Sequence, residues 1–242
     1  MHALDFDTQI LLSEFDPGSH AARERSLLPR LAPQEQARYR SFSAEARRHS
    51  WLAGRELLRV AVERALGTVD AAALLTEDSG GVRYASGGVH LNLSHSGDWF
   101  AAAVAPIPVG VDIERVRLRA VTAQAERVFC ANEAASLARE ADPLTAFYRL
   151  WTLKEAACKA VGLTVWDALQ RVCFDLERGR CSLSPPFPGG PWRFMHGAFE
   201  PGWRIALALQ GMSGTPKISC WRRHGGTWEM HALEALSFVA DH

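Results

Sequence analysis

The chain has no surplus of either charge, because its 27 lysines and arginines are matched by 27 aspartates and glutamates among 242 residues. A protein that binds nucleic acid or an anionic membrane through its overall charge needs a clear positive surplus. We therefore expect neither a nucleic-acid partner nor a membrane partner. Any recognition of a charged partner has to come from a local group of side chains.

A long hydrophobic run and a leader-like segment are also missing. The longest apolar stretch, residues 100–111, is too short to span a bilayer and is interrupted by Pro106 and Pro108. Near its start the chain carries Asp5 and Asp7 instead of a basic segment followed by an apolar one, which is not the pattern of a secretory signal. These features favour a cytoplasmic protein.

Closely spaced cysteine pairs are absent as well. The cysteines are odd in number and none lies in a Cys-x-x-Cys pair, which argues against a disulfide framework and against a structural zinc site. A reducing compartment fits this usage best. The five residues concerned are Cys130, Cys158, Cys173, Cys181 and Cys220.

What is present is an ordinary folded chain, whose length allows one large domain or two small ones. Apolar residues at helical spacing predict helices within residues 33–66, with a break near Ser43 that makes two of them. The same pattern predicts helices over 132–141 and 143–161.

Alternating and apolar runs predict strands over 89–93, 99–104 and 109–114, and short strands after Val172. Residues 94–98, Ser-His-Ser-Gly-Asp, are predicted to form the turn between the first two strands. A faint repeat, in which a helix bearing Trp is followed by an alanine-rich strand, suggests two similar halves. Chance recurrence in a chain with eight tryptophans explains that repeat equally well.

Two acids alternate with apolar residues in the segment Gly-Val-Asp-Ile-Glu of residues 110–114. The strand period of two puts Asp112 and Glu114 on one face, roughly 7 Å apart at Cα. Carboxylates this close repel each other unless a cation lies between them or one is protonated, and oxygen ligands suit a hard ion such as Mg²⁺. The alternative is an edge strand with two solvated acids.

A row of functional side chains is predicted on the helix 143–161. Trp151, Glu155 and Lys159 recur every four residues and therefore share one face. A solvated Glu–Lys pair is the alternative, although a tryptophan heading the row is unusual on a solvated face. The buried stripe of the same helix is predicted to be Leu150, Leu153, Ala157 and Val161.

The polar segment around Ser94, His95 and Ser96 combines hydroxyls, turn amides and an imidazole, which together can cradle a phosphate. A turn that only caps local structure is the alternative. A serine hydrolase is disfavoured because the Gly-x-Ser-x-Gly elbow is missing.

In this order and spacing, three segments resemble the signature of the Sfp-type 4′-phosphopantetheinyl transferases. They are Asn-Leu-Ser-His-Ser at 92–96, Gly-Val-Asp-Ile-Glu at 110–114 and Trp-x-x-Lys-Glu-Ala-x-x-Lys at 151–159. The Trp-Lys-Glu-Ala form is the variant met in enzymes that tolerate many carrier proteins. The resemblance extends from about Pro33 to about Val172.

The resemblance implies an α+β fold of two pseudo-symmetric halves, residues 1–107 and 108–242, with the active site in the cleft between them. It implies transfer of the 4′-phosphopantetheine group of coenzyme A to a serine of an apo acyl or peptidyl carrier protein, with release of adenosine 3′,5′-bisphosphate. Mg²⁺ is the expected cofactor, coenzyme A the co-substrate, and a monomer the expected state.

The resemblance also assigns roles to single residues. Asp112, Glu114 and Glu155 would hold Mg²⁺, and Glu155 would also act as the general base. Lys159 would neutralise the departing phosphate, and His95 is the third catalytic candidate. Contacts to coenzyme A would come from Ser94, His95, Arg38, Arg48, Lys154 and Lys159. The Gly-Lys-Pro or Gly-Arg-Pro turn of the family is replaced by Gly-Gly-Val-Arg at 80–83, which leaves that contact open.

Two other functions remain open. An inactive module that binds coenzyme A or a nucleotide is disfavoured because Asp112, Glu114 and Lys159 occur together with Glu155. A metal phosphohydrolase would release phosphate or pantetheine without a carrier protein.

A basic segment follows the acidic strand and is a candidate surface for an acidic carrier protein, with Val128 and Phe129 as the expected apolar contacts. Its arginines are Arg115, Arg117, Arg119 and Arg127.

Overall fold

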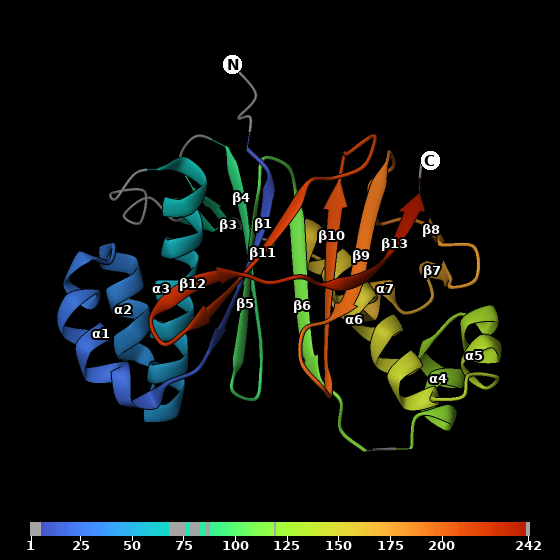
Figure 1. The fold of residues 1–242 in the computed structure, drawn as a ribbon, viewed down its shortest axis with the longest axis horizontal. Coiled ribbons are helices and arrows are strands. Elements are labelled where there is room, and N and C mark those ends of the chain that lie inside the picture. Colours follow the sequence, from blue (N-terminus) through green and yellow to red (C-terminus); the bar gives the residue numbers. More distant parts are fainter. Residues whose placement is uncertain (1–5, 68–75, 78–82, 86–87, 119, 241–242) are drawn as a thin grey trace.

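The computed structural model describes residues 6–67, 76–77, 83–85, 88–118 and 120–240. Figure 1 shows two β-sheets side by side, with one group of helices on the outer side of each. This arrangement confirms the predicted α+β fold of two similar halves. No helix in the described part of the chain is long and apolar enough to cross a bilayer.

The first sheet has seven strands and is covered by the N-terminal helices (Figure 1). In spatial order its strands are β12 (Thr227–Met230), β11 (Ile218–His224), β1 (Thr8–Glu14), β5 (Trp99–Ala105), β4 (Val89–Ser96), β3 (Arg83–Ala85) and β2 (Thr76–Glu77). The helices are the 3₁₀ turns Pro17–Ser19 and Leu28–Arg30 and the α-helices α1 (His20–Ser26), α2 (Pro33–Ser41) and α3 (Glu45–Leu66).

The second sheet has six strands and is covered by the later helices. Its strands are β6 (Val109–Arg115), β10 (Trp203–Gln210), β9 (Trp192–Ala198), β13 (Glu234–Ala240), β8 (Arg180–Leu183) and β7 (Val172–Asp175). The helices are α4 (Thr122–Val128), α5 (Ala131–Leu137), α6 (Pro143–Val161) and α7 (Val165–Ala168). Since β11 and β12 belong to the first sheet, the chain returns to its N-terminal half near its end. The division at residues 107/108 stays a prediction.

Three apolar clusters hold these layers together. One lies between the two sheets, where Leu12 and Ala101 face Val111 and Ile205. The other two lie between each sheet and its own helices, chiefly α3 and α6. Strand β5 is buried along its whole length, because it has α3 on one face and the other sheet on the opposite face.

Most predicted elements are present. The helical segment 33–66 does break into α2 and α3, although the 132–141 helix ends earlier, at Leu137, and α4 had no sequence prediction. The predicted turn 94–98 is wrong, because β4 continues through Ser96 and only residues 97–98 turn. Residues 80–82 lie outside the described part of the chain.

Helix α6 begins after a capping aspartate and ends at a glycine. The Asp142 side chain caps its start by accepting the Thr145 N–H at 3.0 Å, and Gly162 ends it in the left-handed region at a φ of 72°. The predicted stripe is confirmed in that Leu150, Leu153 and Ala157 are fully buried, while Val161 is partly buried. Each buried leucine contributes roughly 1.5–3 kcal/mol to the free energy of folding.

Strand β6 lies unusually close to α6. A Cβ atom on Gly110 would stand 2.0 Å from the Ala156 carbonyl oxygen and 2.5 Å from the Ala160 nitrogen. Both atoms belong to the helix backbone, which cannot move aside as a side chain can. Glycine is therefore required at position 110 for the strand and the helix to meet.

We expect Gly110→Ala to lower the free energy of unfolding by about 1–3 kcal/mol or more, because overpacking against a backbone is not relieved by rotamer changes. Urea unfolding measures this change. Gly189→Ala is the matched control, since a Cβ there meets no atom within 4 Å. Equal stability of the two variants would contradict the close contact.

Candidate functional site

The two sheets are joined by side chains where β4 lies beside β6. Three alternate residues of β4 each accept a backbone N–H of β6, always 19 residues further along the chain. The constant offset means that the two strands run parallel in register although they belong to different sheets. The pairs are Asn92 with Val111 at 3.1 Å, Ser94 with Ile113 at 3.3 Å and Ser96 with Arg115 at 3.3 Å.

The same serines also contact the acids of β6. The Ser94 hydroxyl donates to Asp112 Oδ1 at 2.8 Å, and the Ser96 hydroxyl donates to Glu114 Oε2 at 2.8 Å. Lys159 reaches in from α6, where its Nζ lies 2.6 Å from Asp112 Oδ1. The structure thus brings Ser94, Asp112, Glu114 and Lys159 together.

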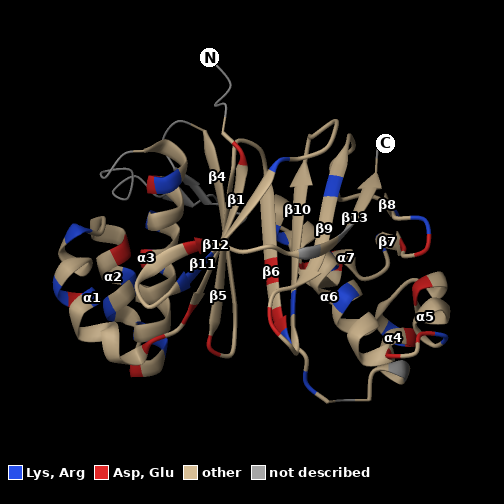
Figure 2. Cartoon of the chain, viewed as in Figure 1, with Lys and Arg blue, Asp and Glu red and all other residues tan. Residues whose placement is uncertain are grey.

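Glu155 lies one turn before Lys159 on α6 and completes the acidic group. Burial raises the pKa of Glu155 to about 7, with the neighbouring charges of Asp112 and Glu114 adding to burial and that of Lys159 opposing it. Three carboxylates therefore share one small volume with a single ammonium close to Asp112. Figure 2 shows the acidic positions of this group on β6 in red, between the two halves of the molecule.

A cavity of about 600 Å³, which we call the basic hollow, lies between α2, α3 and the paired strands β4 and β5. Among its described lining residues none is acidic, so its potential suits an anion. The Arg38 and Arg47 guanidinium groups each lie 5.0 Å from the centre of the Phe42 ring. The lining residues are Arg38, Phe42, Arg47, Ser50, Trp51, Arg55, Leu93, His95 and Phe100.

His95 lines the basic hollow from β4, and the charge of Lys159 in the acidic group acts on its imidazole. Its side chain is exposed. The pKa of His95 lies below its usual value, since partial desolvation and the Lys159 ammonium both disfavour the imidazolium. At neutral pH this imidazole is therefore largely uncharged.

Among the predicted arginines, Arg38 lines the basic hollow and Arg48 does not. Arg48 donates to the carbonyl oxygens of Phe42 at 2.7 Å and Ser43 at 3.3 Å, and so closes the turn between α2 and α3. Sequence reasoning missed Arg47 and Arg55. Their spacing was a usable signal, because residues 47, 51 and 55 share one face of α3.

Lys154 is not brought to the site. Its side chain is fully buried, and its ammonium pairs with Glu133 at 2.9 Å and donates to the carbonyl oxygens of Leu169 and Val172. These partners fasten α5 and the chain after α7 to α6. The prediction of Lys154 as a coenzyme A contact is therefore corrected, because its ammonium has no access to a ligand.

The sequence argument against disulfides is wrong for one pair. Cys130 and Cys173 are bonded, with their Cα atoms 6.0 Å apart, whereas Cys158, Cys181 and Cys220 are free. A separation of 43 residues left no local pattern from which to predict this bond.

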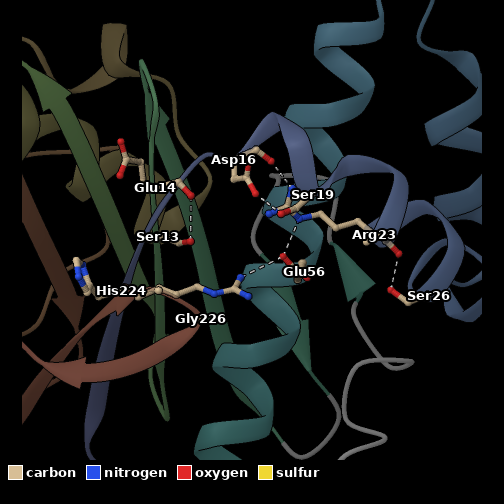
Figure 3. Close-up of a pocket in the computed structure, with 12 residues that line it drawn as sticks. Ser13, Glu14, Asp16, Ser19, Arg23, Ser26, Glu56, His224 and Gly226 are labelled. Atoms are coloured by element: carbon tan, nitrogen blue, oxygen red, sulfur yellow. Dashed lines mark hydrogen bonds and ion pairs between the residues drawn. The ribbon is translucent and has the colours of Figure 1, made fainter.

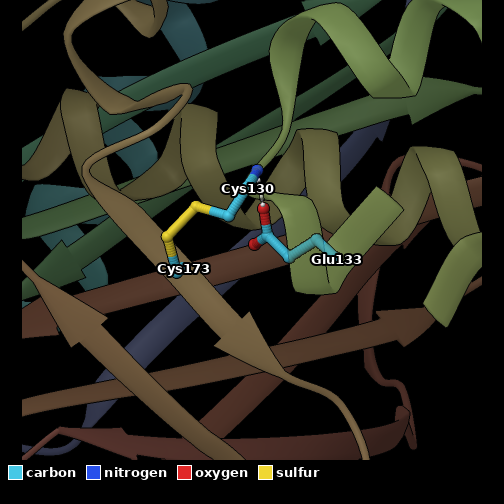
Figure 4. A group of neighbouring side chains, drawn as sticks. All are labelled: Cys130, Glu133 and Cys173. Atoms are coloured by element: carbon cyan, nitrogen blue, oxygen red, sulfur yellow. Dashed lines mark hydrogen bonds between the residues drawn. A yellow bond between two sulfur atoms is a disulfide. The ribbon is translucent and has the colours of Figure 1, made fainter. Parts of the chain in front are cut away.

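Glu133 lies beside the two bonded sulfurs (Figure 4), with donor atoms of all three residues within 4.8 Å of one another. This group does not suit a metal ion, because the sulfurs are bonded to each other. The Glu133 carboxylate already accepts the N–H groups of Cys130 and Phe174 and pairs with Lys154. We interpret the group as a structural one, which links α5 to α6 and to β7.

A second cavity, of about 610 Å³, lies between the N-terminal segment, α3 and the β11–β12 turn (Figure 3). Its two arginines share one acid, since Glu56 lies 2.8 Å from Arg23 and 3.5 Å from Arg223. Glu14 and Asp16 add further negative charge. This cavity offers no positive surplus, so the basic hollow is the better candidate for an anion.

The predicted apolar contact for a carrier protein is partly wrong. Phe129 is only 2% exposed and packs against Phe147, with ring centres 5.0 Å apart. Leu118, in contrast, is 95% exposed and follows the exposed Arg117. Arg119 lies outside the described residues.

In the metal-free protein the raised pKa of Glu155 has a consequence for stability. The unfolded chain loses this proton near pH 4.5, whereas the folded protein keeps it until about pH 7. The stability contributed by this group is therefore lost as the pH rises across that window. In excess chelator we expect Glu155→Gln to raise the free energy of unfolding at pH 8 by about 1–2 kcal/mol after solvent screening, and to change little at pH 4.5.

Urea unfolding at several pH values measures the difference. Glu229→Gln, at an exposed position of β12, is the control. If Glu155→Gln changes the free energy of unfolding equally at pH 4.5 and pH 8, the crowding of carboxylates around Glu155 is contradicted.

Known proteins of one family are similar to part of this chain. Residues 108–208 match the model of the 4′-phosphopantetheinyl transferase superfamily. A phosphopantetheinyl transferase from Thraustochytrium sp. is 33% identical over 177 residues, which is 65% of this chain and 62% of that protein. The 4′-phosphopantetheinyl transferase psf-1 from Bacillus pumilus is 36% identical over 124 residues, 50% of this chain and 53% of that protein.

A 4′-phosphopantetheinyl transferase from Bacillus subtilis is 32% identical over 146 residues, 59% of this chain and 65% of that protein. The matched part of the chain thus spans between 53% and 65% of the length of these three relatives.

Proposed function

Because residues 108–208 match the 4′-phosphopantetheinyl transferase superfamily, we propose that the chain moves the 4′-phosphopantetheine group of coenzyme A to a serine of an apo acyl or peptidyl carrier protein. Adenosine 3′,5′-bisphosphate is the second product. The observation that carries the proposal is the meeting of Asp112, Glu114 and Glu155 with Lys159.

We propose Mg²⁺ as the cofactor, held by Asp112, Glu114 and Glu155. The Oδ2 atom of Asp112 is buried and has no hydrogen-bond partner, which is costly unless a cation satisfies it. A donor set of carboxylate oxygens alone suits a hard divalent ion. When bound, the ion would stabilise negative charge on the phosphate oxygens.

The side chains of α6 supply the remaining groups. In the transfer the serine oxygen forms a bond to phosphorus, and the bond from phosphorus to the leaving phosphate breaks. Glu155 would accept the serine proton as the general base. The Lys159 ammonium would offset the charge on the departing phosphate.

The basic hollow is the proposed site for the nucleotide part of coenzyme A. Its volume of about 600 Å³ is that of an ordinary ligand pocket. Arg38 and Arg47 offer charge-assisted hydrogen bonds to phosphate, and His95 lines the same hollow. Three cations are left out of this set because protein groups hold them: Arg48, Arg55, which pairs with Glu35 at 3.3 Å, and Lys154.

The proposal is tested with coenzyme A, Mg²⁺ and a panel of apo carrier proteins, each weighed by mass spectrometry. We expect at least one carrier protein to gain the mass of phosphopantetheine, and Asp112→Ala to lower the rate by about 100-fold or more. Glu229→Ala, at an exposed acid, is the control. Release of phosphate or pantetheine without a carrier protein would favour a phosphohydrolase, and binding of coenzyme A without any product would favour an inactive module.

We expect Arg38→Ala and Arg47→Ala each to raise the KM for coenzyme A by about tenfold, because each removes one charge-assisted phosphate contact. The KM for the carrier protein should stay unchanged. Arg48→Ala is the matched control, because its guanidinium closes the α2–α3 turn and should cost stability more than affinity. If Arg38→Ala and Arg47→Ala both keep the parent's KM for coenzyme A, the nucleotide does not bind in the basic hollow.

The basic segment after β6, in which Arg117 and Leu118 are exposed, is the proposed docking surface for an acidic carrier protein. Combining Arg117→Glu with Arg119→Glu should raise the KM for the carrier protein and remove most of its salt dependence, since steering by exposed charges is screened by salt. Steady-state kinetics at several salt concentrations measure both effects. Loss of affinity for coenzyme A to the same degree, or no loss at all, would contradict this assignment.

A further inference from the structure

The hydroxyl of Ser94 has used its whole hydrogen-bonding capacity within the protein. A serine hydroxyl has one donor and two acceptor lone pairs. Ser94 donates to Asp112 Oδ1 at 2.8 Å and accepts from the Ile113 N–H at 3.3 Å and from Lys159 Nζ at 2.9 Å. Its side chain is also buried, with 5% exposed. A phosphate could bind Ser94 only by displacing one of these partners.

Ser96 repeats the pattern two residues later. Its hydroxyl donates to Glu114 Oε2 at 2.8 Å and accepts the Arg115 N–H at 3.3 Å. Each serine therefore contacts a carboxylate 18 residues further along the chain and a backbone N–H 19 residues further along. One hydroxyl thus fixes both the position of β6 and the orientation of an acid on it.

Asn92 begins the same row and extends it to the helix. Its side-chain oxygen accepts the Val111 N–H at 3.1 Å, and its Nδ2 donates to the Lys159 carbonyl oxygen at 3.4 Å. Since β4 and β6 lie in different sheets, these side-chain contacts determine how the two strands are aligned. The row therefore sets where the acids stand relative to α6.

We propose that Ser94 and Ser96 are positioning residues, which hold the Asp112 and Glu114 carboxylates in the orientation that binds a divalent cation, and that they are not contacts to coenzyme A. This inference rests on the proposed function only for the identity of the metal ligands. The physical reason is that a carboxylate held in one rotamer binds a cation better than one that must first be ordered.

The test uses Mn²⁺ as the probe and isothermal titration calorimetry on the protein alone, without coenzyme A or carrier protein. We expect Ser96→Ala to weaken Mn²⁺ binding by about 10- to 100-fold, as is typical when a partner of a metal ligand is removed. Ser96→Thr keeps the hydroxyl and should bind Mn²⁺ almost as the parent does. Ser182→Ala, at an exposed serine of β8, is the matched control and should match the parent.

A second readout separates positioning from substrate contact. Ser94→Ala should raise the Mg²⁺ concentration needed for half-maximal rate and leave the KM for coenzyme A at saturating Mg²⁺ unchanged. A raised KM for coenzyme A with unchanged Mn²⁺ affinity would make Ser94 a phosphate contact and overturn the inference. If Ser94→Ala does not fold, the comparison of Ser96→Ala with Ser96→Thr still tests the positioning role, because Ser96 is only half-buried.

Parent-like Mn²⁺ affinity in Ser96→Ala would overturn the inference, as would a parent that does not bind Mn²⁺. The proposed function can fail separately. A parent that modifies no carrier protein but shows the expected order of Mn²⁺ affinities would refute the transferase and support the positioning role.

Discussion

The close approach of β6 to α6 at Gly110 is the constraint on which the site depends. A strand normally lies further from a helix because side chains separate the two backbones. At Gly110 no Cβ intervenes, and the space such an atom would take is already occupied by the Ala156 carbonyl oxygen. The acids of β6 and the polar row of α6 are therefore brought within reach of each other, as the contact between Asp112 and Lys159 shows.

The charges of the site are divided between the two halves of the molecule. The second half supplies the carboxylates of Asp112, Glu114 and Glu155, and the first half supplies the arginines of the basic hollow. His95 lines the basic hollow and feels the charge of Lys159 in the acidic group. An anionic ligand with several phosphates, bound together with a cation, would match this division, because its metal-bound part and its free phosphate part need opposite surroundings.

Helix α6 is fixed on the side that faces away from the acidic group. Lys154 and Glu133 form a fully buried ion pair, and the Cys130–Cys173 bond joins the start of α5 to β7 beside it. Removing one partner of such a pair would leave an uncompensated buried charge, which is strongly destabilising. Neighbouring positions of one motif thus serve different purposes, since Lys154 anchors the helix and Glu155 faces the acids.

The sequence by itself determined which residues share a face, because the periods of strand and helix follow from backbone geometry. It therefore predicted that Asp112 and Glu114 lie on one face of a strand, and it predicted most of the buried stripe of α6. Only the tertiary structure decided what each face meets. The Ser94 and Ser96 contacts, the burial of Lys154 and the Cys130–Cys173 bond all join segments far apart in the chain, and no local pattern encodes such partners. Local periodicity orients a side chain, whereas its partner is fixed by the packing of the whole fold.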